Sequence, residues 1–192
     1  MAFFFIKDFK HRYRFFSSEP ENGISDKISR SKEIWRKAQK KLLLLPSRIL
    51  RQEQGLIKVL QNTEESLIVH CSGLLSQKRM KLRFSFFLHQ QRSKHILLLL
   101  GEALLLPLSG LAALLPGPNV TFAVLALLII THWRALRGIN RLARKKIEFV
   151  RAPTFSEWEK AVGRGAETRY GEILDKLEKE FRLSGLNKIL WK

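Results

Sequence analysis

The sequence is poor in cysteine, in acidic residues and in recognisable catalytic motifs. Its one cysteine, Cys71, cannot form an internal disulfide, which excludes a disulfide scaffold. There is no C-x-x-C pair, no nucleophile motif and no glycine-rich phosphate loop, so we expect neither an enzyme nor a bound cofactor. The five histidines, at positions 11, 70, 89, 95 and 132, are not at ligand spacing, which predicts no metal site. At 192 residues the chain has room for one domain, or for a small domain with appendages.

The few acidic residues are distributed unevenly and divide the chain into three parts. The chain has 35 Lys and Arg against 17 Asp and Glu, a net charge of +18. Residues 1–95 carry a net charge of +12 and residues 133–192 carry +7, whereas residues 96–132 contain one charged side chain, Glu102. A nucleic-acid-binding domain would spread its basic residues over a soluble fold, so the pattern disfavours nucleic acid as a partner. Two basic flanks around a nearly uncharged block are typical of a membrane protein.

The uncharged block predicts two transmembrane helices joined by a tight turn. Ile96–Leu115 is a leucine-rich run of 20 residues, about 30 Å as a helix, which suffices to span a bilayer core. Val120–Leu136 is a second run of 17 residues, at the lower limit for a span. Between them, Pro116, Gly117, Pro118 and Asn119 cannot continue a helix and predict the turn of an antiparallel hairpin. The alternative is a buried hairpin in a soluble helical core, which the absence of a polar face on either run disfavours.

Basic residues beside this block predict its orientation. Arg92 and Lys94 precede the first run, Arg134 lies near the far end of the second and Arg137 follows it, while the expected tip has no charge. By the positive-inside rule, both termini should lie on the cytoplasmic side of a bacterial membrane or on the matrix side of the mitochondrial inner membrane. Trp133 stands where an aromatic residue of the membrane interface belongs. The first residues lack the apolar core of a secretory signal, and a mitochondrial presequence stays open as an alternative.

The flanking regions contain strand and helix patterns. Aromatic and β-branched residues predict strands at Phe3–Ile6 and Tyr13–Phe16, paired as a hairpin, with a third strand at Leu67–His70. Helices are expected from Ser31 to Leu45 and from Ser47 to Leu60, because Pro46 interrupts the pattern. After the hairpin, residues 134–150 should continue as a basic helix, followed by a helical segment over residues 156–182 and a short docking helix at the end.

Together these patterns predict a mainly α membrane protein, a two-helix transmembrane hairpin with a small α+β N-terminal region and a helical C-terminal tail. The expected parts are a basic α+β region over residues 1–95, the hairpin over 96–136 with helices 96–115 and 120–136, and a basic helical region over 137–192. The helix expected over residues 75–95 interleaves apolar and basic side chains. It is compatible with binding to anionic lipid headgroups, or equally with an ordinary packed helix that has a solvated basic face.

Two sequence anchors in the hairpin resemble a known family. LPGPN at 115–119 and HWRALRG at 132–138 are similar to the anchors of the mitochondrial potassium–proton exchange-related proteins. Ala123–Ile129 and Thr131–His132 depart from the family pattern, which often has aromatic residues at the former and a Ser or Tyr near the second anchor. The resemblance implies an integral inner-membrane protein connected with potassium–proton exchange.

The resemblance leaves the role open between carrier and accessory factor. A secondary transporter alternates access between two bundles built from several helices each, which two helices cannot do as a monomer. We therefore expect an accessory or regulatory factor in preference to a sole carrier, with anionic membrane lipids and a homo-oligomer or larger ion-exchange complex as partners. The alternative is a membrane-tethered basic adaptor that binds anionic lipid, nucleic acid or the ribosome.

Glu102, the acid inside the apolar block, is the candidate site residue. Folding the hairpin about Gly117 and Pro118 places Glu102 level with His132, Trp133 and Arg134. One hypothesis is an ion pair of Glu102 with Arg134 that joins the two helices, with Gly101 permitting close approach. The other is a carboxylate that binds protons or potassium, with His132 as a relay.

Overall fold

The protein is organised around a mixed four-stranded sheet. The computed structural model describes residues 2–18, 47–112 and 120–191. The strand order is β2-β1-β3-β4, with bounds β1 Phe3–Lys7, β2 Tyr13–Ser17, β3 Ser66–Ser72 and β4 Lys146–Ala152. β1 is antiparallel to β2, while β1 with β3 and β3 with β4 are parallel pairs. The three strands predicted in the N-terminal flank are confirmed.

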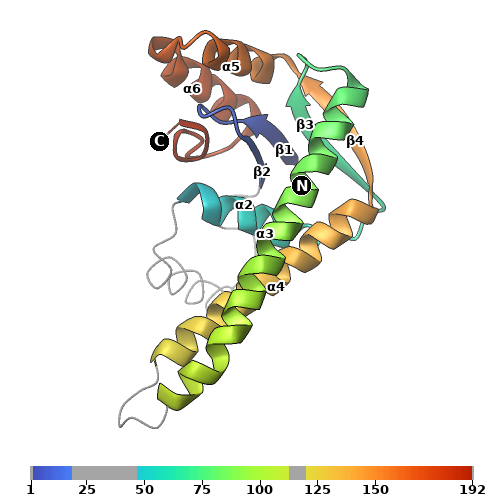
Figure 1. The fold of residues 1–192 in the computed structure, drawn as a ribbon. Coiled ribbons are helices and arrows are strands. Elements are labelled where there is room, and N and C mark those ends of the chain that lie inside the picture. The colour runs from blue at the N-terminus through green and yellow to red at the C-terminus, as the bar shows by residue number, and fades with distance from the viewer. Residues whose placement is uncertain (1, 19–46, 113–119, 192) are drawn as a thin grey trace.

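Helices cover both faces of this sheet. Successive side chains of the inner strand β1 point to opposite sides, and they are apolar on both. Phe4 and Ile6 are buried against α5 (Pro153–Gly163), α6 (Tyr170–Phe181) and the final turn η2 (Asn187–Trp191). Phe3 and Phe5 are buried in a second core, which includes side chains of α2 (Ser47–Lys58), α3 (Gln77–Ala112) and α4 (Val120–Arg144). A short turn, η1 (Glu167–Arg169), joins α5 to α6. The result is a three-layer arrangement of helices, sheet and helices (Figure 1).

The hairpin of α3 and α4 connects the parallel strands β3 and β4. Parallel neighbours need a crossover connection, and here the whole helical hairpin supplies it. The beginning of α3 and the end of α4 pack on the sheet through Phe84, Phe87, Ile139 and Leu142. The other half of the hairpin projects away from the sheet (Figure 1).

The prediction of a transmembrane hairpin, and with it the membrane fold class, is wrong. Among the residues that the structure describes, no helix is both long enough and apolar enough to cross a membrane. The described apolar part of α3, Ile96–Ala112, has 17 residues and includes Glu102, and α4 has 14 residues before Arg134. Both fall short of the roughly 20 apolar residues that a span requires. The predicted turn at Pro116, Gly117, Pro118 and Asn119 lies outside the described residues, as does the helix predicted from Ser31 to Leu45.

The prediction of a basic helix over residues 134–150 is also wrong, beyond Arg144. α4 ends at Arg144, and Lys146–Ala152 forms the edge strand β4 beside β3. In β4 the half-buried Ile147 and Phe149 alternate with exposed residues, which is the strand period of two. The central sheet therefore combines strands from the predicted N-terminal region with one from the predicted C-terminal region. The helical segment predicted over 156–182 corresponds to α5, η1 and α6.

The start of α3 is a packed helix with a basic outer face. Met80 and Phe84 are buried against the sheet. The basic side chains on the other side are exposed, namely Lys78, Arg79, Lys81 and Arg83. Anionic lipid as the partner of this face stays a prediction.

Candidate functional site at a junction of three helices

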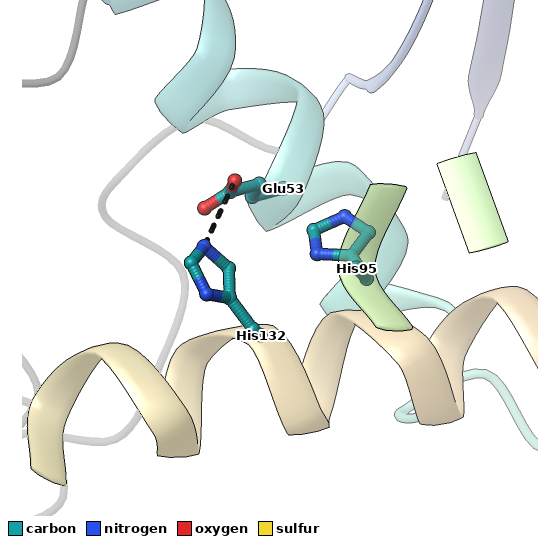
Figure 2. Close-up of side chains that lie close together, drawn as sticks. All are labelled: Glu53, His95 and His132. Carbon is teal, nitrogen blue, oxygen red and sulfur yellow. Dashed lines mark ion pairs between the residues drawn. The ribbon is translucent and has the colours of Figure 1, made fainter. Parts of the chain in front are cut away.

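A cluster of buried polar side chains lies where α2, α3 and α4 meet. Glu53 comes from α2, His95 from α3 and His132 from α4, and the three side chains converge (Figure 2). Their exposed fractions are 3%, 0% and 5%, and that of Glu102, also on α3, is 7%. Acidic residues are rarely buried this deeply without a charged or hydrogen-bonding partner, so the cluster calls for a chemical explanation.

A close approach of α2 to α4 positions Glu53 beside His132. Gly138 of α4 lies against the backbone of α2, and a Cβ at this position would be 2.0 Å from the carbonyl oxygen of Leu56. Only glycine allows two helix backbones to come so near. Because Leu56 follows Glu53 by about one turn of α2, the contact sets the height of Glu53 along α4. The glycine of the HWRALRG anchor is thus a packing residue for the cluster.

His132 lies between two carboxylates. Its Nδ1 lies 2.6 Å from Oε1 of Glu102 in a buried hydrogen bond. A carboxylate that accepts this hydrogen bond requires Nδ1–H of His132 as the donor, and in the tautomer of the ring with its proton on Nδ1 the lone pair is at Nε2. Nε2 lies 3.9 Å from Oε1 of Glu53, the pair drawn in Figure 2. The pair with Glu102 therefore orients the other ring nitrogen toward Glu53.

Several buried polar atoms of the cluster have no hydrogen-bond partner among the residues that the structure describes. They are both ring nitrogens of His95, Oε2 of Glu53 and Oε2 of Glu102. Each such atom costs about 1–3 kcal/mol of desolvation free energy that no contact in the described chain offsets. Gln52, next to Glu53, donates its amide to Oε1 of Gln91 at 2.9 Å, so α2 and α3 are joined by one conventional contact beside the cluster.

Burial disfavours the charged forms of Glu53 and His95. It raises the pKa of Glu53, and the negative charge of Glu102 acts in the same direction, while His132 and Lys94 oppose it. Burial also lowers the pKa of His95 to about 4, with smaller contributions from His132 and Lys94. His95 is therefore a neutral imidazole near pH 7, the form that donates a nitrogen lone pair to a cation.

The donor set decides which ligands the cluster suits. One ligand atom from each of Glu53, His95 and His132 lies within 4.8 Å of the others. Two imidazoles with a carboxylate are typical ligands of zinc and neighbouring transition metals. Potassium is bound instead by oxygen atoms such as rings of backbone carbonyls, and Ca²⁺ and Mg²⁺ also prefer oxygen. The sequence reasoning, which predicted no metal site, did not identify this group.

The structure brings together some of the predicted site residues and separates others. Glu102 is level with His132, as the folding of the hairpin required, and pairs with it. Arg134 is exposed and forms no ion pair with Glu102. Gly101 has open space around it and mediates no close contact. The residues predicted for the membrane interface, which are Trp133, Arg137, Arg92 and Lys94, are all exposed.

Sequence reasoning missed Glu53 and His95. His95 had a signal, since it precedes Glu102 by seven residues, two helical turns along one face of α3. Glu53 had none, because α2 is separate in sequence from the hairpin and only tertiary packing brings it to His132.

The comparisons with known proteins gave one match. A sequence model of the family described as mitochondrial K⁺–H⁺ exchange-related matches residues 26–145. No curated protein and no solved structure matches the chain. The matched range contains all four residues of the cluster and ends just before β4.

Proposed function

Because the chain belongs to the mitochondrial K⁺–H⁺ exchange-related family, we propose that it is an accessory or regulatory factor of potassium–proton exchange in mitochondria, not the sole carrier. The proposed role is non-catalytic. Its proposed partner is another component of the exchange assembly, because a factor that does not move the ions itself must act on the protein that does.

The donor chemistry of the buried cluster carries this proposal. A potassium pathway needs several oxygen ligands that replace the hydration shell of the ion. The cluster of Glu53, His95, His132 and Glu102 instead offers imidazole nitrogens beside two carboxylates, all nearly inaccessible to solvent. Such a cluster is poorly suited to binding and releasing potassium in every transport cycle.

The architecture supports the same choice. Alternating-access carriers move two helical bundles or repeats against each other around a central site. In residues 47–112 and 120–144, the hairpin of α3 and α4 packs with α2 at the cluster. The parts of these three helices nearest the sheet share a hydrophobic core with it. A hairpin anchored in this way is suited to contact a second protein more than to rock around a substrate.

Two measurements test the proposal. The purified full chain is reconstituted in liposomes, and potassium-dependent proton flux is recorded with a pH-sensitive dye. We expect flux equal to that of protein-free liposomes, and flux above this level would make the chain a carrier. Mitochondria that lack the protein should show reduced potassium–proton exchange that re-expression restores. Normal exchange in its absence would remove the proposed connection altogether.

A further inference from the structure

We propose that Glu53, His95 and His132 form a binding site for a divalent transition-metal ion of the zinc type, in which Glu102 positions His132. The inference concerns the same cluster but does not rest on the proposed function. It follows from the unpartnered atoms, the convergence of the ligands and the orientation of His132.

The unpartnered atoms are the ones that a metal ion would use. His95 is fully buried, yet neither of its ring nitrogens has a hydrogen-bond partner in the described chain. A buried core histidine ordinarily hydrogen-bonds through at least one nitrogen. Oε2 of Glu53 is likewise buried and unpartnered, and the side chain points into the same space as the two rings (Figure 2). Nitrogen and carboxylate ligands from three helices therefore converge.

The distances require only a small contraction for metal binding. Zinc binds imidazole nitrogen and carboxylate oxygen at about 2.0–2.2 Å, which separates two ligands of a tetrahedral site by about 3.3–3.6 Å. Nε2 of His132 and Oε1 of Glu53 are 3.9 Å apart, so this pair would close by about 0.3–0.6 Å. All three ligand atoms lie within 4.8 Å of one another, so no pair would have to close by more than about 1.5 Å.

Glu102 supplies the outer contact that metal-binding histidines usually have. A ligating imidazole commonly donates its second N–H to a carboxylate, which fixes the ring and makes the ligating nitrogen more basic. His132 has this contact, with Nδ1 at 2.6 Å from Glu102 and Nε2 facing Glu53. A divalent cation would in turn offset the cost of ionising a buried carboxylate in this cluster.

A metal ion at this site would also stabilise the packing of the three helices. Glu53, His95 and His132 come from α2, α3 and α4, so one ion would crosslink elements that are distant in sequence. A ligand that binds only the folded state shifts the folding equilibrium in proportion to its occupancy. At a metal concentration 100 times the Kd, the ratio of folded to unfolded protein rises about 100-fold.

The experiment measures metal binding by the full chain without a polyhistidine tag. After removal of metals with a chelator, Zn²⁺ is titrated in competition with a chromophoric indicator, and Co²⁺ is added separately to record its visible absorption. We expect one site per chain, a Co²⁺ spectrum of a tetrahedral or five-coordinate ion, and a melting temperature raised by Zn²⁺ but not by Mg²⁺. The absence of saturable Zn²⁺ binding by the folded wild-type protein would overturn the proposal.

Variants assign the ligands. Glu53→Gln, which keeps the shape of the side chain, and His95→Ala should each abolish the Co²⁺ spectrum and weaken Zn²⁺ binding at least 100-fold. His89→Ala, an exposed histidine on the same helix, is the matched control and should bind like the wild type. Site binding that persists in the folded Glu53→Gln protein, or that disappears in His89→Ala, would contradict the assignment.

The positioning role of Glu102 has its own signature. Glu102→Gln should retain one site but bind Zn²⁺ about 10–100-fold more weakly, as when an outer carboxylate is removed from a ligating histidine. Loss of the site altogether would make Glu102 a ligand, and unchanged affinity would remove its role. Neither result depends on potassium flux, so failure of the metal site and failure of the proposed function are distinguishable.

Discussion

Gly138→Ala tests whether the contact between α2 and α4 builds the cluster. The added Cβ would lie 2.0 Å from the carbonyl oxygen of Leu56 and 2.8 Å from its carbonyl carbon, whereas ordinary contacts begin at 3.4 Å. The obstacle is backbone and cannot rotate away. The two helices must therefore separate by about 1.4 Å at this point, or the local fold must rearrange.

The expected loss of stability combines two opposing effects. Overpacking of a close contact costs about 1–3 kcal/mol, and more where backbone must move. Alanine in a helix interior recovers about 0.5–1 kcal/mol relative to glycine. We therefore expect Gly138→Ala to lower the free energy of unfolding by about 2 kcal/mol.

Gly101→Ala is the matched control, since it makes the same change within the hairpin. Nothing lies within 4 Å of a Cβ at Gly101, and the residue is exposed. Only the helix propensity changes, so this variant should be more stable than the wild type by up to about 1 kcal/mol.

Urea unfolding followed by circular dichroism measures both variants. The difference between them should be about 3 kcal/mol, with equal m-values if both unfold in two states. The separation of α2 from α4 should also weaken Zn²⁺ binding, because Glu53 and His132 lie on those helices. If Gly138→Ala proves as stable as Gly101→Ala, the close approach does not exist in solution and the argument for the junction fails.

Three further predictions concern the sheet and its helices. The buried carboxylate of Asp8 pairs with Arg14 at 2.8 Å and accepts backbone N–H groups. Asp8→Asn should therefore lower the free energy of unfolding by about 2–3 kcal/mol, measured by urea unfolding. Trp158→Phe removes the indole N–H donated to the carbonyl of Lys7 at 2.8 Å and should cost about 1–3 kcal/mol in the same assay; an unchanged midpoint would contradict the role of this bond. Burial raises the pKa of Cys71 from 9.0 to about 11, so the unfolded thiol ionises first and this contribution to stability is lost as pH rises from about 9 to about 11. Cys71→Ala should flatten the stability–pH curve in that range, and an unchanged slope would refute the cause.

Local patterns in the sequence were sufficient where neighbouring residues decide the structure. The aromatic runs of Phe3–Ile6 and Tyr13–Phe16 form the predicted hairpin, because β propensity and a short connection act over a few residues. The two long helices occur on either side of the LPGPN anchor. Even the pairing of Glu102 with His132 could be approached from the sequence, since the turn of a hairpin fixes which residues are level.

The wrong predictions, of the transmembrane spans and of the helix beyond Arg144, rest on the composition of a segment. The structure of these segments depends on what they pack against. A leucine-rich run has the same appearance whether it faces lipid or protein, so the sequence predicts spans that the described helices do not support. The basic pattern that follows the hairpin predicts helix as far as Val150, and only pairing with β3 makes Lys146–Ala152 a strand.

The sequence by itself determined the strands of the N-terminal hairpin, the helical hairpin and the residues that its turn places level with one another, because each depends on interactions close along the chain. Tertiary structure alone decided the candidate site. Glu53 on α2 is 79 residues before His132 on α4, and no periodicity connects them. They meet because Gly138 lets two helix backbones approach more closely than any side chain would allow.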